Sequence, residues 1–133
     1  MNQAPHSIPT SCGQGIAINL LDKIRRIDGH WQPHVVAQMN DYQFKVVKIE
    51  GDFVWHAHAE TDETFLVLEG ELRIDFRDAS IVLKAGELAV VPKGVEHKPY
   101  AAHEVKILLV EPRGVLNTGD SESDRTAPND IWI

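Results

Sequence analysis

Between residues 34 and 111 the sequence is a succession of short β-prone runs, and this feature limits the possible folds more than any other. The runs are rich in β-branched and aromatic residues, and Gly, Pro, Asn or Asp separates most of them. Such spacing is typical of an all-β sandwich or barrel, because βαβ units would need helices of about 10–15 residues between the strands. The predicted strands are 34–39, 42–49, 53–58, 63–68, 72–76, 81–84, 88–91, 95–100 and 105–111.

A short helix precedes these strands and a polar tail follows them. Residues 16–27 carry apolar side chains at helical spacing, and an Asp-Gly pair then ends the pattern. The last three residues, 131–133, are apolar and are expected to dock back onto the strands. The predicted organisation is a flexible leader over 1–15, one domain over 16–115 and a C-terminal arm over 116–133.

The overall composition fits one domain and argues against several classes of protein. The chain has 133 residues, of which 43% are hydrophobic, and this is enough for a single core. No apolar run approaches the ~18 residues of a membrane span, and the first residues lack the features of a secretion signal. The net charge of -7 argues against a nucleic-acid partner, since phosphate binding needs clustered Lys and Arg. A single cysteine cannot form an internal disulfide, so the protein is expected in the cytoplasm.

Four residues have the chemistry and spacing of a metal site. His56 and His58 are two residues apart, so in a strand their imidazoles point to the same face. Glu63 follows the next turn and is expected to point back at the histidines, while Glu60, inside that turn, is the rival carboxylate. His97 comes after a Pro-x-Gly turn, on the less charged face of its predicted strand. An isolated His-x-His pair is more often structural, so the metal hypothesis depends on the other two residues.

Three imidazoles and one carboxylate form a borderline set of nitrogen and oxygen donors. This set suits one divalent ion of Fe, Mn, Ni, Zn or Cu, and it suits Ca²⁺ or Mg²⁺ poorly. Four protein ligands leave one or two coordination positions for water or a small molecule on an ion that prefers five or six. The sequence therefore predicts a metal site that is open to a small-molecule ligand.

The spacing of these residues resembles the two sequence motifs of the cupin superfamily. The first motif, G-x5-H-x-H-x3,4-E-x6-G, corresponds to Gly51, His56, His58, Glu63 and Gly70, with the first gap one residue short. The second motif, G-x5-P-x-G-x2-H-x3-N, corresponds to Gly86, Pro92, Gly94 and His97, with Ala101 in place of Asn. The resemblance implies a double-stranded β-helix, or jelly-roll, barrel whose metal ligands are His56, His58, Glu63 and His97.

The segments 91–99 and 111–119 are similar to a narrower group of small single-domain cupins labelled mannose-6-phosphate-isomerase-like. That label is an analogy, because one fold hosts many unrelated functions. The expected function is that of a metal-dependent enzyme of isomerase or dioxygenase type acting on a small polar molecule. The alternatives are a binding protein whose ion anchors a sugar or metabolite without turnover, and an ion that only stabilises the fold.

Two large aromatic residues suggest an interface. Strand alternation turns Phe53 and Trp55 away from the histidines, toward the exterior, where large aromatic side chains should not face water. They are therefore expected to lie beneath the N-terminal helix or in the contact of a homodimer.

Overall fold

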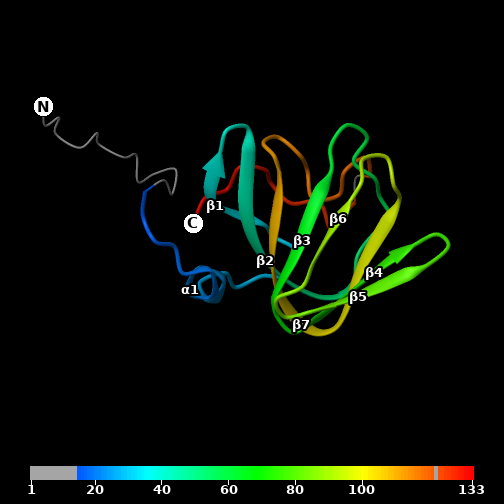
Figure 1. Ribbon diagram of the computed structural model, residues 1–133, viewed down its shortest axis with the longest axis horizontal. Coiled ribbons are helices and arrows are strands. Elements are labelled where there is room, and N and C mark those ends of the chain that lie inside the picture. The colour runs from blue at the N-terminus through cyan, green and yellow to red at the C-terminus, as the bar shows by residue number, and fades with distance from the viewer. Residues whose placement is uncertain (1–14, 122) are drawn as a thin grey trace, which may run out of the picture.

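The computed structural model describes residues 15–121 and 123–133, which form seven strands and one short helix (Figure 1). All strand pairs are antiparallel, and the sheet has the order β1-β2-β7-β3-β6, with β4 pairing to both β7 and β5. The predicted all-β class with a short helix near the N-terminus is therefore confirmed. The elements are α1 (Leu20–Arg25), β1 (His34–Met39), β2 (Tyr42–Asp52), β3 (Glu63–Glu69), β4 (Glu71–Phe76), β5 (Ser80–Lys84), β6 (Leu88–Val91) and β7 (His97–Pro112).

The longest strand, β7, connects the sheet because it pairs with three other strands. Its C-terminal half lies between β2 and β3, and its N-terminal end pairs with β4. The prediction of two separate strands over 95–100 and 105–111 is wrong, because both belong to β7. The residues between them, Ala-Ala-His-Glu, include no turn former, so the chain continues through them as one strand, with a register shift against β2 between Ile49 and Gly51.

The prediction of a strand over 53–58 is also wrong. The chain leaves β2 near a register shift at Gly51, which has φ +83°, and the following residues are irregular apart from an isolated bridge at His56. Without strand alternation, Phe53 points inward and is buried. Its ring stacks on Trp31 with 4.5 Å between centroids and meets His56 edge-on at 5.3 Å. Phe53 therefore belongs to the core and is not available for a dimer contact.

Apolar side chains pack on both faces of the sheet. Successive residues of β2 alternate between the faces, so Val47 joins the inner cluster and Val46 the outer one. In the outer cluster, Ile24 of α1 and Ile27 just beyond it pack with β2 and β7. The helix therefore covers part of the outer face, while the inner cluster surrounds the candidate site.

The helix is shorter than the predicted 16–27. Asn19 is its N-cap, and the side chain of Asn19 accepts a hydrogen bond from the backbone N of Asp22 at 3.0 Å. This cap fixes the start of the helix at Leu20, so the apolar residues before it lie outside the helix.

The last residues dock onto the sheet as expected. Val35 N donates to Ile131 O at 2.7 Å, Ile133 N donates to Val35 O at 3.0 Å, and Trp132 forms a parallel bridge with Val35. Nearly all of the predicted leader, residues 1–14, lies outside the described residues. No helix in the ranges 15–121 and 123–133 is long and apolar enough to cross a bilayer.

Candidate metal centre

The structure brings the four candidate ligands together from three separate places in the chain. His56 and His58 lie on the irregular segment after β2. Glu63 is the first residue of β3 and His97 the first of β7. One ligand atom from each residue lies within 4.8 Å of every other, and all four side chains are buried. The rival carboxylate, Glu60, is exposed and does not belong to this group.

Backbone carbonyl groups orient two of the imidazoles. His56 Nδ1 lies 2.9 Å from Val54 O, and His97 Nδ1 lies 3.0 Å from Val95 O. When each Nδ1–H donates to its carbonyl, the lone pair is on Nε2, which is the atom available to a metal ion. The third imidazole has its Nε2 3.1 Å from Glu63 Oε1.

The buried His97 ring provides a test of whether a metal ion fits here. Its side chain is 0% exposed, and its Nε2 has no hydrogen-bond partner among the described residues, although Glu63 Oε1 is 3.4 Å away. Buried nitrogen atoms of this kind almost always have a partner. An ion bound at the point that the four ligands share would supply one, so the residues present fit a metal ion.

Burial and neighbouring charges set the protonation of the site. Burial, together with the charge of nearby His97, lowers the pKa of His56 to about 4 from its ordinary 6.5, so this imidazole is neutral at pH 7. Burial alone would raise the pKa of Glu63, but the hydrogen bond with His58 and the nearby His97 imidazole hold that pKa below its usual range. A neutral imidazole and an ionised carboxylate are the forms that bind metal ions.

A buried ion pair lies behind the site and was missed in the sequence. Lys45 Nζ is 2.9 Å from Glu111 Oε1, and the two side chains are 4% and 1% exposed. Burial, with the charge of nearby Glu63, raises the pKa of Glu111 well above its ordinary value. A signal was available, because Glu111 continues an inward-facing series of alternate residues, Val105, Ile107 and Leu109.

With this geometry established, comparison with known families identifies the fold. A family model described as "Cupin domain" matches residues 44–111, which is just over half of the chain and includes all four candidate ligands. The chain belongs to the cupin domain family.

The similar proteins include two from bacteria and one from a protozoan. A solved cupin-2 domain containing protein from Shewanella frigidimarina is 61% identical, with a TM-score of 0.71, and the match covers 72% of this chain and 94% of that one. The uncharacterized protein YdbB of Bacillus subtilis is 42% identical over 57% of this chain and 68% of its own length. Acireductone dioxygenase of Leishmania braziliensis is 31% identical over 68% of this chain, but the match spans 29% of the dioxygenase.

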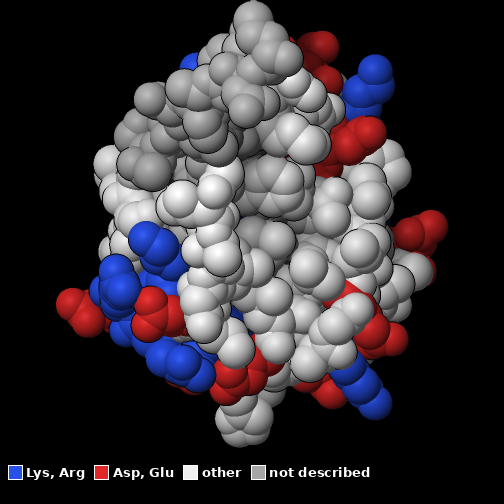
Figure 2. Space-filling view, turned by 60° about the vertical axis from the view of Figure 1, so that its left-hand side comes forward, with Lys and Arg blue, Asp and Glu red and all other residues white. Residues whose placement is uncertain are grey.

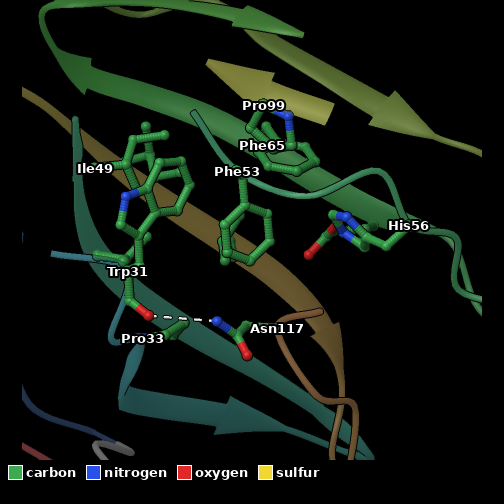
Figure 3. A pocket seen from close by; sticks show the side chains of 12 residues that line it. Trp31, Pro33, Ile49, Phe53, His56, Phe65, Pro99 and Asn117 are labelled. Atoms are coloured by element: carbon green, nitrogen blue, oxygen red, sulfur yellow. Dashed lines mark hydrogen bonds between the residues drawn. The ribbon is translucent and has the colours of Figure 1, made fainter. Parts of the chain in front are cut away.

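An apolar cavity adjoins the candidate metal centre of this cupin (Figure 3). Phe53 lies between Trp31 and His56, and the amide of Asn117 donates a hydrogen bond to Trp31 O at 3.3 Å. The cavity volume is about 30 Å³, which holds about two water molecules or a methyl-sized group at the ~10–15 Å³ that one water needs. Its polar lining residues are His56, Glu63 and Asn117, and the others are Trp31, Pro33, Val47, Ile49, Phe53, Phe65, Pro99, Ile107 and Leu109.

Proposed function

We propose that this cupin binds one divalent transition-metal ion (Fe, Mn, Ni, Zn or Cu) and is a metal-dependent enzyme that acts on a small molecule. The ligands are His56, His58, Glu63 and His97. The observation that carries the proposal is the fully buried Nε2 of His97, which lacks a hydrogen-bond partner among the described residues. An unsatisfied buried polar atom costs about 1–3 kcal/mol, and ion binding removes that cost.

The chain contributes orientation, charge and exclusion of water. Val54 O and Val95 O fix two imidazoles with their Nε2 atoms free, and the ionised Glu63 offsets part of the charge of a divalent ion. The apolar cavity keeps bulk water away from one side of the site. When bound, the ion would supply Lewis acidity or redox chemistry for isomerase- or dioxygenase-type reactions.

The cavity lining favours a substrate with a polar, metal-binding head and a small apolar group. Lys and Arg are absent from the described residues that line it, so nothing there would pair with a sugar phosphate. We therefore propose that the resemblance to mannose-6-phosphate-isomerase-like cupins reflects descent rather than isomerase activity. Dioxygenase-type chemistry is the better candidate, in keeping with the relative named acireductone dioxygenase.

Metal reconstitution combined with oxygen uptake tests the proposal. The chain is stripped with chelator, reloaded with Fe²⁺, Mn²⁺, Ni²⁺ or Zn²⁺, and assayed for oxygen consumption with catechols, enediols and thiols. We expect one ion per chain, and oxygen uptake with at least one redox-active ion. His58→Ala is expected to lose the ion, and the exposed His103→Ala is expected to keep it. A wild-type chain that retains no ion after reloading contradicts the proposed site.

The alternative function is a binding protein whose metal ion anchors a ligand without turnover. It is favoured by the lining of the cavity, because the titratable side chains among the described residues that line it are His56 and Glu63, which are both proposed metal ligands. A ligand that binds the native state raises the melting temperature by mass action. Thermal shift with metal-loaded protein and no consumption of the same compounds would support this alternative.

We also propose a homodimer, through a surface other than the expected one. Trp55 is half-buried, and one face of its ring is covered within the chain by the Arg77 guanidinium, 3.9 Å away. On the outer face of β6, Leu88 and Val90 are 59% and 52% exposed and lie opposite β3. Figure 2 shows that the α1 side of the molecule also has a broad uncharged surface with charged side chains at its margin. A second copy related by a twofold axis would cover Leu88 and Val90, so Leu88→Glu is expected to give a monomer in light scattering.

Two further expectations belong to the same proposal. Closure of the sheet into a jelly-roll barrel is supported by β7, which pairs with β4 as well as with β2 and β3 around one inner cluster. A cytoplasmic location is supported by the single cysteine and is checked by cell fractionation.

A further inference from the structure

The segment that carries His56 and His58 is held between β7 and the C-terminal arm. On the β7 side, His56 N donates to His97 O at 3.0 Å, and His97 N donates to His56 O at 2.9 Å. On the arm side, Ala57 N donates to Asp120 Oδ1 at 2.9 Å, and Asp120 N donates to Ala57 O at 3.1 Å. Asp120 therefore forms hydrogen bonds with both the backbone N–H and the backbone C=O of Ala57, the residue between the two histidines. The arm replaces the neighbouring strand that this irregular segment lacks.

The arm also contacts one ligand side chain directly. Gly119 has φ +56°, and a Cβ at this position would lie 3.1 Å from His58 Nδ1 and still closer to Ala57 O. The backbone of the arm is therefore packed against the imidazole with no room for a side chain between them. Next to this contact, Ser121 Oγ donates to Trp55 O at 3.1 Å.

The arm is itself folded and tied to the rest of the domain, where Asn117 Nδ2 donates to Trp31 O at 3.3 Å, so it can position what it touches. Thr118 is 0% exposed, and its Oγ1 lies 2.8 Å from Thr126 Oγ1. The Asn117 side chain accepts from Ala127 N at 2.9 Å and donates to Arg125 O at 2.8 Å. These bonds fold the arm back on itself at the point where it meets the ligand segment.

We propose that Gly119 and Asp120 are positioning residues of the metal centre. They hold the ligand segment at the separation from Glu63 and His97 that one ion requires. The inference rests on the proposed metal-binding function. It goes beyond the family, because the region matched by the cupin model ends at Glu111 and the arm follows it.

The test compares two Asp variants of the arm in the full-length chain. Asp120→Ala removes the acceptor for Ala57 N, whereas Asp120→Asn keeps an oxygen acceptor and removes the charge. Asp124→Ala is the matched control, because Asp124 is exposed on the same arm and has no hydrogen bond or ion pair with the described residues. Binding is measured by Co²⁺ titration, and the visible absorption of bound Co²⁺ reports the ligand geometry.

We expect Asp120→Ala to weaken Co²⁺ binding about 10–100-fold, the range for residues that orient metal ligands, and to change the Co²⁺ spectrum. Asp120→Asn and Asp124→Ala are expected to match the wild type in both measurements. Gly119→Ala is expected to weaken binding at least as much as Asp120→Ala.

Two results would overturn the proposal. Equal Co²⁺ affinity and spectra in Asp120→Ala and Asp124→Ala would show that the arm does not position the ligands. A lower melting temperature of metal-free Asp120→Ala, with affinity and spectrum unchanged, would show a merely structural role. Absence of Co²⁺ binding by the wild type would instead contradict the metal centre itself, so the two failures are distinguishable.

Discussion

The two halves of the candidate metal centre are built in different ways. Glu63 and His97 begin strands whose backbones are fixed by pairing, β3 with β6 and β7 with β4. His56 and His58 lie on a segment outside any strand, held by the bridge to His97, by the hydrogen bond from Gly94 N to His58 O at 2.8 Å and by the C-terminal arm. We call Glu63 and His97 the ladder half of the site, and His56 and His58 the loop half. Regular structure therefore positions one half of the site, whereas contacts between distant parts of the chain position the other.

The largest expected effect is the loss of metal on removal of His97, a ligand of the ladder half. His97 is 0% exposed, so little water can fill the position that His97→Ala leaves. His58 borders a surface depression together with Glu60 and Asp120, so water can replace the lost ligand in His58→Ala. We expect both variants to bind Co²⁺ more weakly. Loss of a residue that only orients a metal ligand typically lowers affinity by up to about 100-fold, and the loss of affinity in His97→Ala is expected to be well above this value. A weaker effect at His97 than at His58 would contradict the comparison.

The next effect concerns the ion pair behind the ladder half. Glu111→Leu leaves the Lys45 ammonium buried without its partner, which typically costs about 3–5 kcal/mol of unfolding free energy. Urea denaturation measures this loss. The double variant Lys45→Met/Glu111→Leu is expected to recover most of the stability, because an apolar pair of similar volume needs no charge partner. A cost of under about 1 kcal/mol for the single variant would show that Lys45 reaches water.

A third effect, on the pH dependence of the unfolding free energy, concerns His56 of the loop half. The pKa of His56 is about 4 in the folded metal-free chain and near 6.5 when unfolded. Above pH 6.5 both states are neutral and His56 has no effect. As the pH falls from 6.5 to 4, the unfolded chain binds a proton that the folded chain does not, so stability falls by about 3 kcal/mol and then levels off. Urea denaturation of metal-free protein checks this, and His56→Asn is expected to remove that share of the pH dependence.

Sequence patterns predicted the ladder half well. The alternation of apolar residues in 63–68 and 105–111 gave β3 and the C-terminal half of β7, and the motif spacing singled out the four residues that the structure brings together. Glu111 continues the inward series of β7, and Lys45 precedes the inward Val47 and Ile49 of β2. These two charged residues were missed because a charged residue on a strand is usually solvent-exposed.

The loop half could not be predicted in the same way. The predicted outward direction of the Phe53 side chain was wrong because strand alternation was applied to residues that form no strand. The contact between Ala57 and Asp120 joins residues 63 positions apart, and no local pattern marks either of them. Asp120 lies in a polar tail whose composition resembles that of a flexible segment, and its role follows only from the folded arrangement.

The smallest expected effect on Co²⁺ affinity is that of Gly51→Ala, which is compared with Gly119→Ala on the other side of the loop half. Gly51 has φ +83° and nothing within 4 Å of a Cβ, so Gly51→Ala adds backbone strain alone, about 1 kcal/mol. Its Co²⁺ affinity is expected to stay at the wild-type value, because the bridge at His56 and the arm still hold the ligands. Gly119→Ala adds similar strain but also meets Ala57 and His58. If both variants weaken Co²⁺ binding equally, the geometry of the loop half is set where it leaves β2 and not by the arm.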